Sequence, residues 1–289
     1  MLAWYYITII AAVLMGAATI IEKYALKREH ATAYTAAFTV LSAVAALPLI
    51  PFSNLNLPLS AWGLVYLISV LATIGYLLMA KVYRHGNISI ASAITSSVPS
   101  LFVVLMGFAF LGEVLSPEQY MSIMVLVFAG YIFLARFNNG QADAKGHGIK
   151  FIDKLLGASF VIALGYILVK YLFNGGISPI TYVLLSQLFV ALNMLVYMVL
   201  KFGGLKEISS HIKANSKPLA AIAILTVAYR VPLYSSISLI QTSLAVPLLN
   251  GVFIIVTVMV GGLLFREGNI WKKILISAVL LAASYFLIL

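Results

Sequence analysis

The chain is built from apolar runs of about 20 residues that are separated by short polar segments. A helix of that length crosses about 30 Å of hydrocarbon. Only helices and closed barrels satisfy every backbone group inside a bilayer, and the short alternating segments of a barrel are missing. The pattern therefore predicts an all-α integral membrane protein with ten transmembrane helices. Their expected ranges are 3–24, 33–52, 60–83, 88–111, 118–136, 153–173, 179–200, 217–239, 242–265 and 271–289.

The composition agrees with an integral membrane protein. Hydrophobic residues make up 63% of the chain and charged residues 9%, which leaves too few polar groups to cover a water-soluble globule. The chain has no cysteine, so disulfides, thiolate metal sites and cysteine nucleophiles are excluded. It opens as Met1-Leu2-Ala3-Trp4 without a basic segment, and we expect the first apolar run to be retained rather than cleaved.

The basic residues predict an orientation. With both chain ends on one side of the membrane, all of the 18 basic residues except Lys170 and Arg230 fall on the other side. By the positive-inside rule that side is cytoplasmic, and both termini lie outside the cell (plasma or inner) membrane. The net charge of +10 is thus an orientation signal. We expect contact with membrane lipids and none with nucleic acid.

An internal repeat divides the chain into halves. Residues 242–289 align with residues 88–135 without a gap. Identical pairs include Ser89 with Ser243, Val98 with Val252, Gly107 with Gly261, Glu113 with Glu267 and Tyr131 with Tyr285. Loops that are basic in one half are neutral at the matching place in the other, as an inverted repeat of five helices requires. We expect a five-helix repeat over 1–137, a cytoplasmic linker over 138–150 and an inverted five-helix repeat over 151–289. Such halves predict alternating access to a site near the midplane.

Arg230 is the most informative single residue. It falls near the middle of the eighth predicted helix, where a charge costs about 2.5 to 3.5 kcal/mol, and Pro232 breaks the helix two residues later. In the functional interpretation Arg230 pairs with an anionic group of a substrate. In the structural alternative it binds carbonyls or hydroxyls, or reaches toward the interface. Both interpretations remain open at this point.

Other polar residues complete a candidate site. Ser92, Ser96 and Pro99 share one face of the fourth helix, and Asn250 in the ninth helix aligns with Ser96. Facing polar patches would line a central cavity, whereas the alternative is tight helix packing. The remaining substrate-binding candidates are Tyr76, Gln187, Tyr229 and Tyr234, for which lipid-facing or core positions are the alternative.

The sequence gives little support for ion coupling, for a metal site or for catalysis. Glu22 is the coupling candidate, but its place beside Lys23 near the cytoplasmic end favours facilitated diffusion or exchange. Glu113 and Glu267 are expected to anchor helix ends at the interface. The histidines are all in predicted cytoplasmic loops without metal-ligand spacing, so we predict no metal and no cofactor. The sequence shows no catalytic constellation and no Gly-rich phosphate loop, which argues against an enzyme or an ATP-driven pump.

One segment resembles a known family. The run VPSLFVVLMGFAFLGEVLSPEQY over 98–120, followed by AGYIFL over 129–134, resembles the fourth and fifth helices of the ten-helix EamA-like branch of the drug/metabolite transporter superfamily. The second copy departs from the pattern, because Arg266 replaces Gly112 and Phe253 replaces Pro99. The resemblance implies a secondary transporter, commonly an exporter of small metabolites such as amino acids or amphipathic compounds. We expect a small amphipathic or zwitterionic substrate that meets Arg230, and a monomer or homodimer. The alternatives are a transporter of cations such as magnesium and, less favoured, an integral membrane enzyme.

Overall fold

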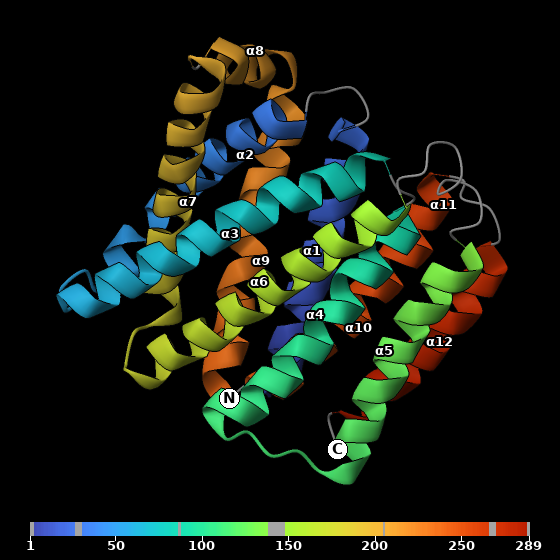
Figure 1. Cartoon of the computed structure of the whole chain (residues 1–289). Coiled ribbons are helices and arrows are strands. Elements are labelled where there is room, and N and C mark those ends of the chain that lie inside the picture. Colours follow the sequence, from blue (N-terminus) through green and yellow to red (C-terminus); the bar gives the residue numbers. More distant parts are fainter. Residues whose placement is uncertain are drawn as a thin grey trace.

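The computed structural model describes residues 3–26, 31–85, 88–137, 148–204, 206–265 and 270–287. Within these ranges the chain is helical throughout and contains no strand (Figure 1). The long helices are α1 (Trp4–Leu26), α2 (Ala31–Ala46), α3 (Leu59–His85), α4 (Ile88–Leu111), α5 (Pro117–Phe137), α6 (Gly148–Asn174), α7 (Pro179–Phe202), α9 (Ser216–Leu239), α10 (Thr242–Val256) and α12 (Ile270–Phe286). The shorter elements are a 3₁₀ turn η1 (Leu47–Phe52), α8 (Lys206–Ala214), a π-helical turn η2 (Thr257–Gly261) and α11 (Gly262–Leu264).

The apolar character of these helices identifies an integral membrane protein. In the described part of the chain, 7 helices are long and apolar enough to cross a membrane. They cover Trp4–Ala25, Thr32–Phe52, Leu59–Met79, Leu156–Asn174, Pro179–Phe202, Ser216–Leu239 and Thr242–Leu264. A further apolar stretch, Thr95–Leu111, lies in α4. Each helix range predicted from the sequence overlaps one of the long helices.

The structure differs from the sequence-based expectation at two places. Residues 206–214 were expected to be loop, but they form α8, whose Ile208 is buried against α2 while Lys206 is exposed. An amphipathic pattern in so short a segment is easily hidden by its many polar residues. The ninth predicted helix is also not uniform, because it changes from α to π geometry at Thr257. The Thr257 hydroxyl donates to the carbonyls of Phe253 and Ile254, which lie one turn earlier.

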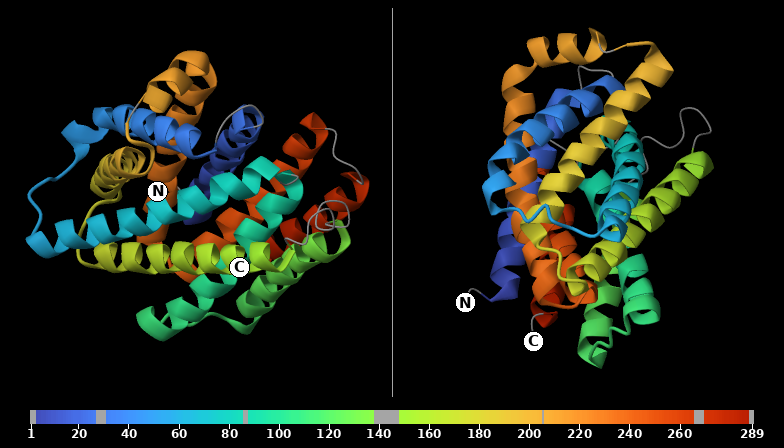
Figure 2. Two further views of the ribbon diagram at one scale, coloured as in Figure 1. Left: turned by 45° about the horizontal axis from the view of Figure 1, so that its top comes forward. Right: turned by 90° about the vertical axis from the view of Figure 1, so that its left-hand side faces the viewer.

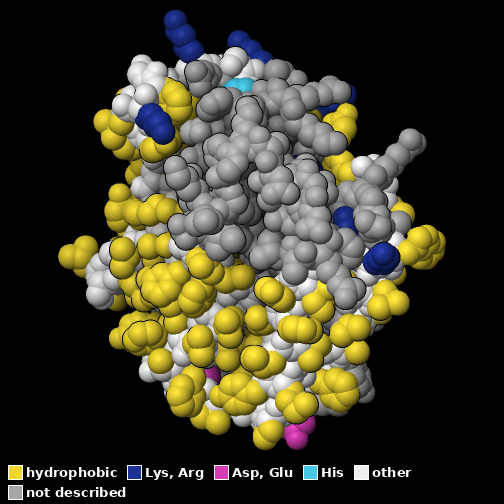
Figure 3. All heavy atoms as spheres, turned by 45° about the vertical axis from the view of Figure 1, so that its right-hand side comes forward, with side chains coloured by type: hydrophobic (Ala, Val, Ile, Leu, Met, Phe, Trp, Pro, Cys, Tyr) yellow, Lys and Arg dark blue, Asp and Glu magenta, His cyan; other side chains and the backbone are white. Residues whose placement is uncertain are grey.

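The chain ends and a group of basic side chains lie at opposite ends of the molecule. Both chain ends lie at the lower end in Figure 1, whereas α8 lies at the upper end, and a second direction of view agrees (Figure 2). On the face drawn in Figure 3, Lys and Arg side chains lie in the upper half and apolar side chains cover the lower half. Lys201, Lys206, Lys213 and Lys217, from the end of α7 through the start of α9, belong to the basic end. The chain ends therefore lie opposite this basic end.

Contacts between helices follow a paired pattern. Helix α1 packs along α9 and also contacts α10, and α6 packs in the corresponding way along α3 and α4. Helix α2 contacts α7 and α9, and α7 contacts α2 and α3. Helices α4 and α10 pack against each other, with α5 beside α4, α12 beside α10, and α5 against α12. Elements from both parts of the chain therefore meet throughout the core.

Three helices at the centre of the bundle contain a proline. Pro99 lies inside α4, Pro232 inside α9 and Pro247 inside α10. A proline within a helix removes one backbone donor and leaves a carbonyl one turn earlier without its usual partner. Pro232 follows Arg230 by two residues, so Arg230 lies in the part of α9 where a backbone donor is missing.

Candidate functional site

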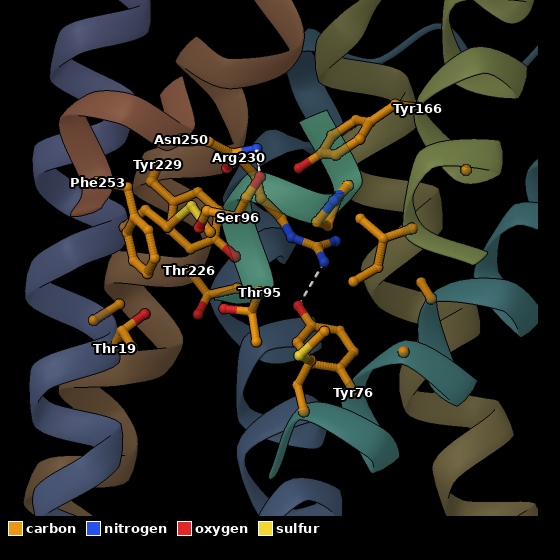
Figure 4. A pocket seen from close by; sticks show the side chains of 18 of the residues that line it. Thr19, Tyr76, Thr95, Ser96, Tyr166, Thr226, Tyr229, Arg230, Asn250 and Phe253 are labelled. Atoms are coloured by element: carbon orange, nitrogen blue, oxygen red, sulfur yellow. Dashed lines mark hydrogen bonds between the residues drawn. The ribbon is translucent and has the colours of Figure 1, made fainter. Parts of the chain in front are cut away.

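A cavity of about 200 Å³ lies between α1, α3, α4, α6, α9 and α10, with one wall residue each from α2 and α7 (Figure 4). Side chains from the first and second parts of the chain line it together. Most of the wall is apolar. The polar side chains in the wall are Thr19, Glu22, Tyr76, Thr95, Ser96, Tyr166, Tyr182, Thr226, Tyr229, Arg230, Tyr234 and Asn250. A small, largely apolar space with a few polar groups is typical of a site for a small organic ligand.

Arg230 is the one basic side chain in the described wall of the cavity. Its side chain is 7% exposed, and Nη2 donates a hydrogen bond of 2.5 Å to the Tyr76 hydroxyl. The guanidinium carbon also lies 5.5 Å from the centre of the Tyr76 ring, within the range of a cation–π contact. Among the described residues no carboxylate forms an ion pair with Arg230. A guanidinium has five N–H donors, and the phenol uses one of them.

Tyrosine rings surround the guanidinium. Tyr182 and Tyr234 meet edge to face with ring centres 4.7 Å apart, and Phe173 packs against both at 5.8 and 6.3 Å. Phe38 packs against Tyr76 with a separation of 5.2 Å. Figure 4 shows Arg230 with Tyr76, Tyr166 and Tyr229 around the same space. Aromatic walls with hydroxyl groups suit a ligand that is partly apolar and partly polar.

Asn250 connects two central helices at the edge of the cavity. Its amide nitrogen donates to the Ser96 carbonyl at 3.1 Å and to the Ser100 hydroxyl at 2.9 Å. Ser100 in turn donates to the Ser96 carbonyl, as serines in apolar helices commonly do. The two interpretations of this patch, cavity lining and helix packing, are therefore both realised. Asn250 and Ser96 line the cavity while the Asn250 amide holds α10 against α4.

The structure brings most of the predicted site residues together. Those that line the cavity are Arg230, Asn250, Ser96, Pro99, Tyr229, Tyr234, Tyr76 and Glu22. Gln187 does not line it. This residue is 1% exposed in α7, five positions after Tyr182, and so lies about 140° around the helix from that cavity-lining residue. Asn193, also considered with Gln187, instead donates to Thr73. Ser92 belongs to α4, but its side chain is outside the described part of the chain.

The position of Glu22 differs from the one expected from the sequence. Its position near the end of the first helix suggested a place at the cytoplasmic interface, but the side chain lines the cavity together with Thr19, one turn earlier on the same face of α1. The cavity reaches that level of the helix, which the length of an apolar run cannot show. Glu22 is the one acidic side chain in the described wall of the cavity.

Glu113 also differs from expectation. It was expected to anchor the membrane interface, but it is 7% exposed and is bonded to the start of α10. Within the described ranges, no three His, Asp or Glu residues lie together in a group that could hold a metal ion.

Several wall residues were not predicted. Thr226 lies one turn before Arg230 and Thr19 one turn before Glu22, so helical spacing from a predicted residue could have indicated them. Tyr166 and Tyr182 carry no such signal, because their helices are rich in apolar residues on all sides.

Comparisons with known proteins agree with this picture. Residues 2–136 match the EamA-like transporter family, which lies in the drug/metabolite transporter superfamily, and this confirms the resemblance seen in the sequence. A search of curated proteins found no significant match. Among solved structures, one described as "Crystal structure of protein" has a TM-score of 0.62 and 10% identity, covering 98% of this chain and 94% of that one. At this identity the likeness shows a shared fold alone.

Proposed function

Because residues 2–136 match the EamA-like transporter family, which indicates a membrane transporter of the drug/metabolite type, we propose that this chain is a secondary transporter of small amphipathic or zwitterionic metabolites. The observation that carries the proposal is the position of Arg230. Its guanidinium lies in a small, tyrosine-walled cavity between helices of both parts of the chain, with donors left over for an anionic group.

Alternating access is the mechanism that we propose, with ten transmembrane helices arranged as two inverted repeats. The contact pattern supports it, because α1 with α9 and α10 is matched by α6 with α3 and α4. The aligned residues Ser96 and Asn250 also touch each other. Direct contact between equivalent residues is expected beside a twofold axis, and a midplane site at that axis suits this class of transporter.

The orientation that we propose places the basic end in the cytoplasm and both chain ends outside. The support is that α8, which contains Lys206 and Lys213, lies at the end of the molecule opposite the two chain ends (Figure 1). Export or exchange is the expected mode, with a small molecule and membrane lipids as partners. A positively charged Arg230 at the site opposes a cation such as Mg²⁺, so a metabolite is preferred over the cation alternative.

Glu22 is the group through which we propose coupling to a proton or cation, if the transport is coupled. It shares the cavity with Arg230 but carries the opposite charge. A carboxylate inside a membrane protein is costly unless it binds a proton or a cation, and binding can then alternate with that of the substrate. Glu22→Gln should remove any dependence of transport on a pH gradient while leaving counterflow intact. Loss of counterflow as well would assign Glu22 to substrate binding.

The test of the proposed function is counterflow in proteoliposomes. Purified protein is loaded with one member of a panel of amino acids, organic acids, sugars or organic cations, and uptake of the same labelled compound is measured with and without a pH gradient. We expect accumulation of a compound with a carboxylate and an apolar part, recovered chemically unchanged. Accumulation confined to sugars or inorganic cations would contradict the proposal.

A further inference from the structure

The turn between α9 and α10 lies at the end of the molecule where both termini are found. Helix α9 ends at Leu239 and α10 begins at Thr242, so only two residues separate them. The last carbonyls of α9 and the first amides of α10 therefore lie near each other. These groups carry partial negative and partial positive charge, respectively, and neither set has a partner within its own helix.

Glu113 accepts hydrogen bonds from the first backbone amides of α10. Its carboxylate accepts hydrogen bonds from the backbone nitrogens of Thr242 at 2.7 Å and Ser243 at 2.8 Å, and also from the Ser243 hydroxyl. Gly112, with φ of 65°, ends α4 in a left-handed conformation, and the next residue is Glu113. An anion at a helix N-terminus is favourable, and burial strengthens the attraction.

Lys170 donates hydrogen bonds to backbone carbonyls at the end of α9. Its ammonium group, on α6, donates to the carbonyls of Ile237 and Ile240 at 2.8 Å each and lies 3.5 Å from that of Ser238. A cation at a helix C-terminus complements the partial negative charge there. The α9–α10 turn is thus held by a carboxylate on one side and an ammonium group on the other.

The two charged residues belong to different parts of the chain. Lys170 and the turn both lie in the C-terminal part, so they can move together. Glu113 lies in the N-terminal part and reaches across to the turn. Two further contacts cross at this end: the hydroxyls of Thr8 and Ser236 lie 2.5 Å apart, and the Gln241 amide donates to the Val114 carbonyl. Ser236 and Ile237, which lie between Arg230 and the turn, are fully buried, so closely packed protein separates Arg230 from this end of the molecule.

We propose that Glu113 is the latch that keeps the cavity closed on the side of the chain ends, and that its release from Thr242 and Ser243 opens that side, while Lys170 holds the α9–α10 turn together in both states. The inference rests on the proposed alternating access. It goes beyond it by naming the contact that must break when the halves separate at this end.

Gly107 offers a second way to disturb the latch. A Cβ atom at this position would lie 2.6 Å from a Glu113 carboxylate oxygen and would also collide with the Ser243 hydroxyl. Both obstacles are side-chain atoms that can move without a shift of the backbone. Gly107→Ala should therefore displace the carboxylate while leaving the helices in place and the charge unchanged.

The absence of native cysteine allows a direct test. Ala245→Cys in α10 and Ile237→Cys in α9, both at fully buried positions, serve as separate reporters for a hydrophilic maleimide. Each is combined with Glu113→Gln or with Gly107→Ala, and labelling is followed in nanodiscs without substrate. The matched control is Glu118→Gln, which removes an exposed carboxylate at the start of α5 in the same region.

We expect both latch variants to raise the labelling rate of the reporters by about tenfold or more, the change that loss of one charge-assisted hydrogen bond produces. The Glu118→Gln control should label as slowly as the parent. Size-exclusion profiles and thermal melting identify any variant that has simply unfolded. Folded latch variants that label no faster than the parent would overturn the proposal, and because no substrate is present, that result is independent of whether the proposed transport function is right.

Discussion

Replacement of Arg230 tests whether its charge serves a substrate or the fold. Arg230→Ala removes the guanidinium, its hydrogen bond to Tyr76 and the charge in the cavity. Because no described carboxylate is paired with Arg230, its removal leaves no buried partner charge behind. We therefore expect expression and monodispersity near those of the parent protein, together with a large loss of carboxylate transport.

The size of the loss follows from the contacts. A carboxylate bound by two guanidinium N–H groups gains two charge-assisted hydrogen bonds of about 1.5 to 3 kcal/mol each. The phenol of Tyr76 occupies only one of the five guanidinium donors, so its hydrogen bond can be kept. The loss is therefore roughly 3 to 6 kcal/mol, which corresponds to at least about a 100-fold rise in the substrate concentration needed for half-maximal counterflow. Arg230→Lys keeps the charge but loses the two-bond geometry, and we expect a loss of about tenfold.

The assay compares each carboxylate substrate with its neutral amide analogue in proteoliposomes. Arg230→Ala should weaken the carboxylate strongly and the amide little, so that the two become nearly equal. Lys201→Ala, which removes an exposed cation at the basic end, is the matched control and should change neither. Equal losses for the carboxylate and the amide would refute the reasoning and assign Arg230 to structure.

Three further outcomes are expected. Tyr76→Phe frees the one Arg230 donor that the hydroxyl occupies, so carboxylate affinity in counterflow should rise by about two- to tenfold; a fall would show that Tyr76 itself holds the substrate. Asn250→Ala loses two hydrogen bonds between α10 and α4 and should reduce stability by about 1 to 2 kcal/mol, seen as a lower melting temperature in detergent, whereas an unchanged melting temperature would argue against the packing role. Gly16→Ala would bring a Cβ to 2.6 Å from the Val256 side chain and should cost about 1 to 3 kcal/mol by forcing α1 from α10, whereas Gly63→Ala, which meets nothing within 4 Å, should be neutral in the same melt.

The long helices were predictable because a bilayer imposes one dominant constraint on a spanning segment. A spanning helix needs a minimum apolar length, and Pro and Gly mark the ends of the runs, so the sequence predicted where the long helices lie. Helix α8 was missed because short amphipathic helices depend on the surface beneath them, here the cluster around Ile208. The π turn at Thr257 depends on backbone hydrogen bonding that apolar periodicity does not report.

The candidate site was predictable where a residue is expensive to bury. Arg230 and Asn250 are costly in an apolar helix, so each pointed to the protein interior without any knowledge of packing. Glu22 and Glu113 were misjudged because their positions near helix ends allowed a solvated alternative, and only tertiary packing decides between the two. Gln187 shows the opposite error: a buried amide need not face a ligand cavity, and its nitrogen has no hydrogen-bond partner in the described residues.

The π-helical turn after α10 makes the two parts of the chain unequal. Helix α4 runs as an unbroken α-helix from Ile88 to Leu111, whereas its counterpart changes geometry at Thr257. One extra residue in a turn rotates the side chains beyond it by about 100° relative to an unbroken helix. Under the proposed alternating access, the two end states are therefore not equivalent under a twofold rotation, and they differ in free energy. A transporter of this kind would favour one of the two states when it is empty, and backbone geometry would contribute to that preference.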